Sequence, residues 1–359
     1  MDRRFLITLS GLAGILAAGR SPAVHAQTTV RWRVASSFPK SLDTLYGAAE
    51  LFAQKVRQLS GGRFDVSVHP AGELVPAFGV VDAVQAGTID AAHTAPYYFF
   101  GKDETFAIGG AIPFGLNSRQ MSAWTYEGNG LALMREFYAN YRLIHFPCGN
   151  TGAQMGGWMR KPISRLGDLK GLKFRIGGFA GKVIERLGCI PQNIPAGEIY
   201  QALEKGTIDA AEWIGPYDDQ KLGFNKVAPN YYYPGWWEGG LQLDLYIHHK
   251  AFESLSAQYK AMVEAASAYA HGVTQARYDV KNPPALKQLV AAGARLRPFP
   301  PDVMAESFKQ SMALYDEIAA RNPHWKKVYT DYARFRADQN LWFRFTEATF
   351  DRFMQSQKL

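Results

Sequence analysis

Cysteine is scarce in this chain, which has two among 359 residues. So few cysteines exclude a disulfide scaffold, and spacing alone leaves Cys148 and Cys189 either bridged to each other or buried as two thiols. The sequence also has no His-Glu-x-x-His, Cys-x-x-Cys or Gly-x-Ser-x-Gly motif. These absences argue against a zinc protease, a Cys-x-x-Cys redox protein and an α/β-hydrolase.

Clusters of positive charge are also missing, although Lys and Arg outnumber Asp and Glu by 40 to 32. The longest basic runs are pairs such as Lys326-Lys327. A protein that binds nucleic acid gathers its basic residues on one face, so we expect no nucleic-acid partner. No stretch beyond residue 26 approaches the ~20 apolar residues that a transmembrane helix needs.

Residues 1–26 are typical of a secretory signal peptide. Arg3 and Arg4 form a positive end, residues 5–18 are an apolar run, and Ala26 completes a small-residue cleavage site. We therefore expect an exported protein that begins near Gln27. The arginine pair leaves the twin-arginine route open beside ordinary Sec export.

The exported part is long enough, and apolar enough at 47% of the chain, to form two lobes. Near its start, strand-like segments at 30–34 and 64–68 alternate with helical patterns at 42–59 and 77–86. This alternation predicts an α/β lobe with a largely parallel sheet.

An internal repeat indicates that a second lobe has a related architecture. The six residues of 87–92, Gly-Thr-Ile-Asp-Ala-Ala, recur letter for letter at 206–211. Each copy follows a short predicted helix, and its glycine can end that helix in the left-handed conformation before a buried strand. We expect each lobe to present a strand end to a shared crevice.

We expect the first lobe over 27–149 and the second over 150–250, with a strand at 241–247. The region 251–359 is predicted to be mainly helical and to complete the first lobe. Its pattern gives one helix over 257–278 and another over 284–292.

The last predicted helix, 326–355, carries large apolar side chains near heptad spacing. They are Val328, Tyr332, Phe335, Trp342, Phe345 and Phe353. The stripe has two interpretations: it packs on the protein's own lobes, or it forms a helix exchanged between the subunits of a homodimer.

Arg175 is the candidate anion-binding residue. It lies on the predicted strand 172–176, directly before the Gly177-Gly178 turn and a helix N-terminus. A guanidinium at this edge of an α/β sheet can bind a carboxylate through two hydrogen bonds. The alternative is a surface arginine paired with a nearby acid.

Two glutamates, Glu212 and Glu238, are candidates for holding a cation. Glu212 follows the second copy of the repeat, and Glu238 follows a tryptophan pair. Two buried carboxylates need compensation, and a hard cation bound by them and an amide such as Gln154 would supply it. Asn150 is a second amide on the expected passage between the lobes. The alternative is that each glutamate is separately solvated.

With the leader, the two repeat copies, the Arg175 strand, Glu212-Trp213 and Trp237-Glu238, the exported chain resembles the DctP family along its whole length. These proteins are the extracytoplasmic solute-binding components of TRAP (tripartite ATP-independent periplasmic) transporters. The similarity is greatest to the branch that binds 2-oxo acids and lactate.

The resemblance implies a two-lobe periplasmic-binding-protein fold, with wound α/β sheets and a long C-terminal helix that supports a homodimer. It implies that Arg175 binds the substrate carboxylate, and that Tyr97 and Asn150 bind ligand oxygens. A Na⁺ or Ca²⁺ ion would bridge protein and substrate through Gln154, Glu212, the Trp213 carbonyl and Glu238. Its partners would be a small organic carboxylate and the TRAP membrane permease subunits.

The sequence thus predicts a periplasmic protein, not an enzyme, that binds a small 2-oxo or 2-hydroxy acid such as pyruvate or lactate. One alternative is another organic acid: a C4-dicarboxylate, a sugar acid or an aromatic acid. A second is a secreted metal-dependent enzyme acting on organic acids, for which the sequence offers no nucleophile or general base.

Overall fold

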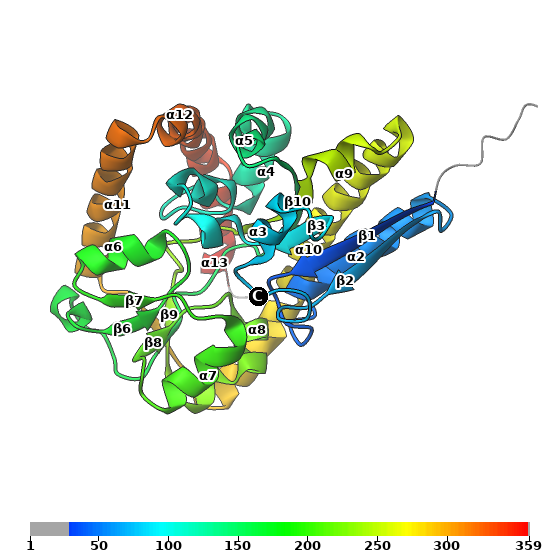
Figure 1. Cartoon of the computed structure of the whole chain (residues 1–359). Helices are drawn as coiled ribbons and strands as arrows, with labels where there is room; N and C mark the ends of the chain where they lie inside the picture. Colours follow the sequence, from blue (N-terminus) through cyan, green and yellow to red (C-terminus); the bar gives the residue numbers. More distant parts are fainter. Residues whose placement is uncertain (1–28, 358–359) are drawn as a thin grey trace, which may run out of the picture.

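The computed structural model describes residues 29–357 and contains two β-sheets, each at the centre of one lobe (Figure 1). The predicted two-lobe α/β fold is confirmed. The first sheet has five strands in the order β2 (Phe64–His69), β1 (Val30–Ser36), β3 (Ala91–Thr94), β10 (Gln242–His248) and β4 (Leu143–Asn150). The second has six, in the order β11 (Arg295–Pro298), β9 (Asn230–Tyr233), β5 (Trp158–Met159), β8 (Ala210–Ala211), β6 (Lys173–Arg175) and β7 (Ile190–Gln192).

The two sheets share one pattern of strand directions. In each, three strands are parallel, β2-β1-β3 in the first and β7-β6-β8 in the second. An antiparallel strand follows, β10 beside β3 and β5 beside β8. The carboxyl ends of the parallel strands are where wound sheets bind ligands.

Helices surround both sheets. Those between the strands are α2 (Leu45–Leu59), α3 (Val80–Gln85), α4 (Ser118–Tyr126), α5 (Gly130–Ala139), α6 (Ala180–Arg186), α7 (Ala196–Glu204) and α8 (Pro216–Leu222). The later helices are α9 (His249–Glu253), α10 (Ala257–Ala291), α11 (Pro301–Arg321), α12 (Pro323–Phe345) and α13 (Glu347–Ser356). Short 3₁₀ turns are η1 (Pro96–Phe99), η2 (Glu104–Gly109), η3 (Leu166–Leu169) and η4 (Phe224–Lys226).

The repeated hexapeptide adopts the same local structure in both lobes. Gly87 and Gly206 each have φ of 71°, the left-handed conformation that ends a helix. The next aspartate then binds the neighbouring parallel strand: Asp90 accepts the Arg33 amide at 2.7 Å, and Asp209 accepts the Lys173 amide at 3.0 Å. Local chemistry therefore repeats with the letters.

Sheet membership differs from the expected lobe boundaries. Strand β10 falls within the range expected for the second lobe, yet it lies in the first sheet, and β11 from the C-terminal region lies in the second. The reason is that the chain crosses between the sheets repeatedly. Segments 151–157 and 234–241 make two of these crossings and lie side by side, joined by a hydrogen bond from the Gln154 amide to the Glu238 carbonyl at 3.3 Å.

Helix α10 is one 35-residue helix, so the predicted break after residue 278 is wrong. Pro283 and Pro284 lie inside it; they lack amide protons and usually end a helix. Tertiary packing overrides this preference, because α10 contacts α2 and β4 of the first lobe and α8 of the second. The helix therefore runs along both lobes (Figure 1).

The predicted last helix is divided at Thr346 into α12 and α13. The hydroxyls of Thr346 and Thr349 bond to carbonyls one turn earlier, an alternative to helix continuation that threonine offers. The apolar stripe also divides. Val328 and Tyr332 are buried, whereas the distal members of the stripe are exposed: Trp342 (59%), Phe345 (68%) and Phe353 (62%).

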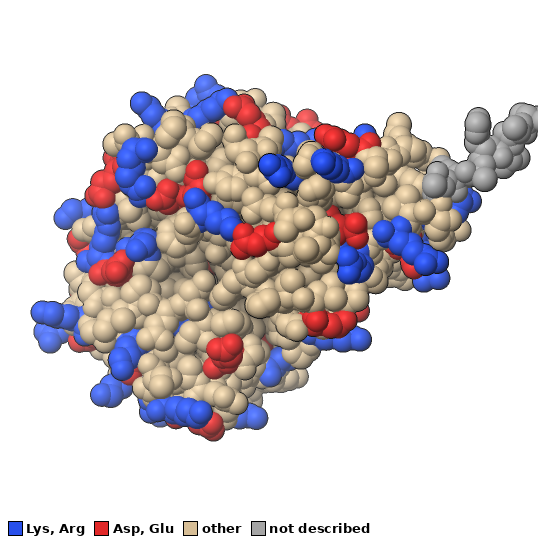
Figure 2. Space-filling model, in the orientation of Figure 1, with Lys and Arg blue, Asp and Glu red and all other residues tan. Residues whose placement is uncertain are grey.

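Both cysteines are free and buried. Of the two alternatives left open by the sequence, two buried thiols is therefore the one the structure contains. The predicted signal peptide lies outside the described residues. Within them, no helix combines the length and apolarity needed to cross a membrane. On the face drawn in Figure 2, basic and acidic side chains are interspersed.

Buried His93 gives a testable acid dependence of stability. Burial lowers the pKa of His93 to about 4, against 6.5 for an ordinary histidine. Between these values the unfolded chain binds a proton that the folded chain does not, so His93 costs stability as pH falls. His93→Gln should thus lose less stability than wild type between pH 7.5 and 4.5, by about 2–3 kcal/mol. Urea unfolding at both pH values measures this, and equal losses would contradict it.

Candidate functional site

Arg175 and Glu212 form a buried ion pair at the carboxyl edge of the second sheet. Arg175 is the last residue of β6 and Glu212 directly follows the neighbouring parallel strand β8. Arg175 Nη1 donates to Glu212 Oε1 at 2.5 Å and to its carbonyl at 2.7 Å, and both side chains are 1% exposed. Arg175 Nε donates to the Ile194 carbonyl at 3.0 Å. The guanidinium is therefore fixed in position.

The Gly177-Gly178 turn supports this pair and closes the gap between the lobes. The Gly177 amide donates to Glu212 Oε1 at 2.7 Å, so this backbone amide holds Glu212 in place. At Gly178, φ is 56° and a Cβ would lie 2.6 Å from the ring of Tyr97 in the first lobe. Only glycine fits this approach.

The two crossings between the lobes supply the amides and the second glutamate. Asn150 ends β4, and its Oδ1 accepts the Gly152 amide at 2.9 Å. Gln154 donates from Nε2 to Thr151 Oγ1 at 3.0 Å. Glu238 lies on the opposite crossing, beside Tyr97, and the neighbouring Tyr98 lies beside Arg175. Residues from both sheets and both crossings thus meet at one place.

Burial raises the pKa values of both glutamates, and like charge adds to this effect at Glu238. Burial raises the pKa of Glu238 well above its ordinary value, and the charge of Glu212 raises it further. Burial also raises the pKa of Glu212, against the opposing effect of Arg175. One arginine does not neutralise two glutamates, so the site has room for further positive charge.

Six buried polar atoms of these residues have no hydrogen-bond partner within residues 29–357. Three are donors: Arg175 Nη2, Asn150 Nδ2 and Trp213 Nε1. Three are acceptors: Gln154 Oε1, Glu212 Oε2 and Glu238 Oε2. Buried polar atoms are normally paired, so unpaired ones at one place indicate a missing ligand.

The acceptor set fits a hard cation. Two carboxylate oxygens and one amide oxygen are the ligands that Na⁺ or Ca²⁺ prefers, and they come from the three side chains predicted from the sequence. The described residues contain no group of three or more His, Cys, Asp or Glu arranged for a metal. A cation here would therefore need its remaining oxygens from the backbone, from water or from a ligand.

A small cavity lies beside Tyr97 and Trp213 of the site. Its walls are Phe38, Leu45, Tyr97, Tyr98, Trp213, Ile214 and Leu241, from both lobes. Its volume is about 10 Å³, which holds one water molecule. The structure is therefore closed, and the lobes must separate to admit an organic acid.

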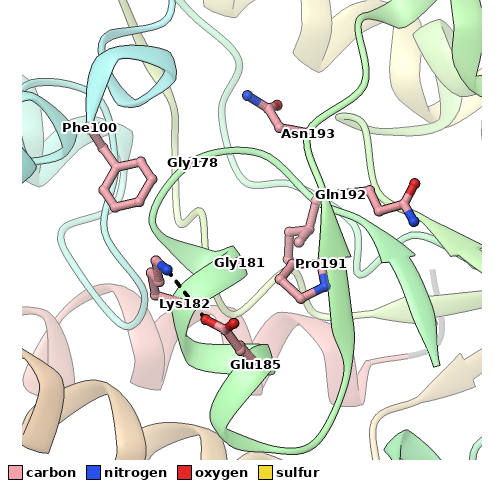
Figure 3. Close-up of a pocket in the computed structure, with 9 residues that line it drawn as sticks. Phe100, Gly178, Gly181, Lys182, Glu185, Pro191, Gln192 and Asn193 are labelled. Atoms are coloured by element: carbon pink, nitrogen blue, oxygen red, sulfur yellow. Dashed lines mark hydrogen bonds and ion pairs between the residues drawn. The ribbon is translucent and has the colours of Figure 1, made fainter. Parts of the chain in front are cut away.

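A larger pocket of about 290 Å³ lies behind the turn that carries Gly178 (Figure 3). Phe100 of the first lobe stands on one side, and α6 and the end of β7 stand on the other, where Lys182 pairs with Glu185 at 3.4 Å. None of the predicted site residues lines it. The pocket lies next to the Arg175 strand, since its lining residue Gln192 pairs with Arg175 in the sheet.

Contacts link six of the seven predicted residues: Arg175 pairs with Glu212 and lies over the Trp213 ring, Tyr97 and Glu238 interact with this pair, and the Gln154 amide binds the Glu238 carbonyl. The seventh, Asn150, ends β4 four residues before Gln154. All seven are buried. Sequence reasoning missed the cavity residues Leu45, Ile214 and Leu241, because nothing distinguishes a leucine that lines a cavity from one in the core. The alternative of a surface arginine is wrong, because Arg175 is buried, although it does pair with an acid, Glu212.

Comparison with known proteins adds independent findings. Residues 35–322 match the family described as bacterial extracellular solute-binding protein, family 7 (DctP). A monocarboxylate 2-oxoacid-binding periplasmic protein of a Nostoc species is 46% identical over 329 residues, which cover 92% of this chain and 90% of that protein.

Two solved structures are similar along almost their whole length. A TRAP transporter solute-binding protein from Bordetella bronchiseptica is 46% identical with a TM-score of 0.91, covering 92% of this chain and 98% of that one. It is a mixed-occupancy dimer with copurified calcium and picolinate in one active site and an apo second site. A TRAP solute-binding protein from Pseudoalteromonas atlantica, with bound sodium and pyruvate, is 35% identical with a TM-score of 0.88, covering 92% and 100%.

Proposed function

The chain belongs to the DctP family of bacterial extracellular solute-binding proteins, and from that premise we propose that it binds a small 2-oxo or 2-hydroxy monocarboxylate together with Na⁺ or Ca²⁺. The observation that carries the proposal is the set of six unpaired buried atoms, three donors beside three acceptors. A 2-oxo acid needs both: donors for its carboxylate, and a cation that its carboxylate and keto oxygens can chelate. The ligands of the similar proteins support this choice.

In this proposal each site residue has one role. Arg175 Nη2 and Asn150 Nδ2 donate to acid oxygens, with Tyr97 at the same cavity. Gln154, Glu212 and Glu238 hold the cation, with the Trp213 carbonyl. Apolar walls such as Leu45 and Ile214 surround a cavity of about 10 Å³, and so small a space favours pyruvate or lactate over a sugar acid or a C4-dicarboxylate.

We propose further that the protein works in the periplasm, reaching it by the Sec or twin-arginine route, and delivers its ligand to TRAP permease subunits. It breaks no bond. In the described structure, no histidine, serine or cysteine lies beside the Arg175–Glu212 ion pair to act as nucleophile. In this proposal both glutamates serve to hold positive charge.

Titration calorimetry tests the proposed function directly. The mature protein should be titrated with pyruvate, lactate, 2-oxobutyrate, succinate, gluconate and picolinate, each with Ca²⁺, with Na⁺ and with neither. We expect the short 2-oxo or 2-hydroxy acids to bind in the presence of a cation and to be recovered unchanged. Binding of succinate or gluconate alone, or conversion of an acid to product, would contradict the proposal.

We propose that the exposed apolar end of the last two helices forms a homodimer. Trp342, Phe345, Phe350 and Phe353 are each at least 59% exposed, and the Bordetella relative is a dimer. Phe350→Ser with Phe353→Ser should convert dimer to monomer in light scattering. Val280→Ser, at an apolar residue 74% exposed on α10, is the matched control and should stay dimeric. A monomeric wild type would contradict the proposal.

A further inference from the structure

Contacts between the two lobes keep the site inaccessible to solvent. Arg175, Glu212 and Glu238 are at most 3% exposed, so no acid reaches them while the lobes stay together. Ligand entry and release must therefore break contacts between the lobes. Any polar contact between the lobes that lies outside the cavity can then set how long the ligand stays, without touching it.

Asp43 is the centre of such a contact. It lies in the turn between β1 and α2 of the first lobe and accepts three donors. These are Lys221 Nζ, Lys281 Nζ at 2.9 Å and the Tyr217 hydroxyl at 3.0 Å. Burial raises the pKa of Asp43, but the hydrogen bonds from these donors outweigh it and lower the pKa to about 2.

Two of the three donors come from the second lobe, and the third comes from the helix that runs along both lobes. Tyr217 and Lys221 lie on α8, which begins four residues after Glu212 in the second lobe, and Lys281 lies on the spanning helix α10. The donors also bind each other: Lys281 Nζ donates to the Tyr217 hydroxyl at 2.7 Å, and each lysine lies 4.3 Å from the Tyr217 ring centre. Figure 1 shows α8 and α10 near the turn before α2, as these bonds require.

Two further hydrogen bonds anchor α8, one to α10 and one to the segment that follows Glu212. The Tyr217 amide donates to Asn282 Oδ1 at 3.1 Å, which ties α8 to α10. In α8, Asp219 Oδ1 accepts the Ile214 amide at 3.3 Å, and Ile214 lines the cavity. Movement of α8 away from Asp43 would therefore move the segment that carries Glu212 and Trp213.

We propose that Asp43, with Tyr217, Lys221 and Lys281, is a latch between the lobes that sets the dissociation rate of the bound acid. The latch rests on the proposed function, since it acts on the closed complex. It does not touch ligand or cation. Its loss should speed opening of the closed state and leave the encounter between acid and open protein unchanged.

Asp43→Asn tests the latch. Half-exposed ion pairs are individually weak, so a cluster of three donors should change affinity by roughly 5- to 20-fold. We expect that loss for pyruvate with Ca²⁺, carried by the dissociation rate in stopped-flow tryptophan fluorescence, with the association rate within about twofold of wild type. The melting temperature of the ligand-free protein should stay near the wild-type value, whereas the rise on adding pyruvate should shrink.

The matched control is Asp82→Asn. Asp82 is also a carboxylate of the first lobe that binds a lysine, Lys102, but both residues lie within that lobe. Its affinity should equal that of wild type. A double-mutant cycle of Asp43→Asn with Lys221→Met should show that the two losses are not additive, because both remove the same contact.

The possible outcomes separate the latch from the proposed function. Wild type that binds none of the acids overturns the proposed function, and the latch with it. Wild type that binds pyruvate, with Asp43→Asn within twofold in affinity and dissociation rate, overturns the latch alone. An equal loss in Asp82→Asn, or a loss confined to the association rate, also overturns it.

Discussion

Arg175→Ala is expected to abolish binding of the acid, with a loss of affinity on the order of 10²- to 10³-fold or more. Arg175 pairs with Glu212 and lies over the ring of the cavity residue Trp213, and its Nη2 is an unpaired buried donor. A carboxylate placed there without the guanidinium would meet two glutamates and no fixed positive charge. Calorimetry with pyruvate and Ca²⁺ measures the loss.

Stability must be separated from binding in this variant. Removing one partner of a buried ion pair typically costs about 3–5 kcal/mol, and Arg175→Ala leaves Glu212 without its partner. Arg175→Lys is the matched variant, since it keeps a positive charge near Glu212 but loses the planar fork. We expect urea unfolding close to wild type for Arg175→Lys, together with affinity still at least tenfold weaker. Wild-type affinity in either variant would contradict the anchor role.

The repeat was predictable because its structure depends on neighbours in the sequence. Gly206 needs only its own backbone freedom, and Asp209 needs only the adjacent strand. The identical letters at 87–92 therefore fold identically. The two lobes differ just after the repeat and on the strand that pairs with it. In the first lobe Ala35 and His93 occupy the positions that Arg175 and Glu212 occupy in the second. At these matched strand ends, the charged side chains thus belong to the second lobe alone.

The crossings between the lobes could not be read from the pattern. Nothing local in 242–248 says which sheet it joins, because either sheet offers an edge for an antiparallel strand. The same holds for the cavity walls, where Leu45 and Ile214 meet only after the lobes close. The unbroken α10 is a third case, since packing against both lobes overrides two prolines. Each of these features is set by contacts far apart in the sequence.

The cation prediction rests on side chains that the fold unites. Glu212 lies at a strand end and Glu238 on a crossing between the lobes. Either glutamate, if it were exposed to solvent, would need no cation. The structure buries both and leaves one oxygen of each unpaired, so the alternative of separate solvation is wrong. With Arg175 and a bound monocarboxylate, the ionised site would carry one positive and three negative charges. A divalent cation brings that total to zero.

Removal of the cation should therefore weaken acid binding by about 100-fold. Three carboxylates beside a single guanidinium in a water-excluded cavity carry a net repulsion of several kcal/mol. A difference of 1.4 kcal/mol corresponds to a factor of ten in affinity. Protein treated with a chelator and dialysed into choline chloride should bind pyruvate weakly, and Ca²⁺ should restore the affinity. Unchanged affinity in choline buffer would contradict the bridging ion.

Glu238→Gln should weaken Ca²⁺ and pyruvate together, each by at least about tenfold, because the amide removes one of the two charges that hold the ion. The ligand-free variant should be at least as stable as wild type, since a neutral amide replaces a buried carboxyl whose pKa is raised by burial and by Glu212. Glu127→Gln, at an exposed glutamate after α4, is the control and should change neither affinity. A Glu238→Gln variant that loses pyruvate but keeps Ca²⁺ would mean that Glu238 contacts the acid and that the ion lies elsewhere.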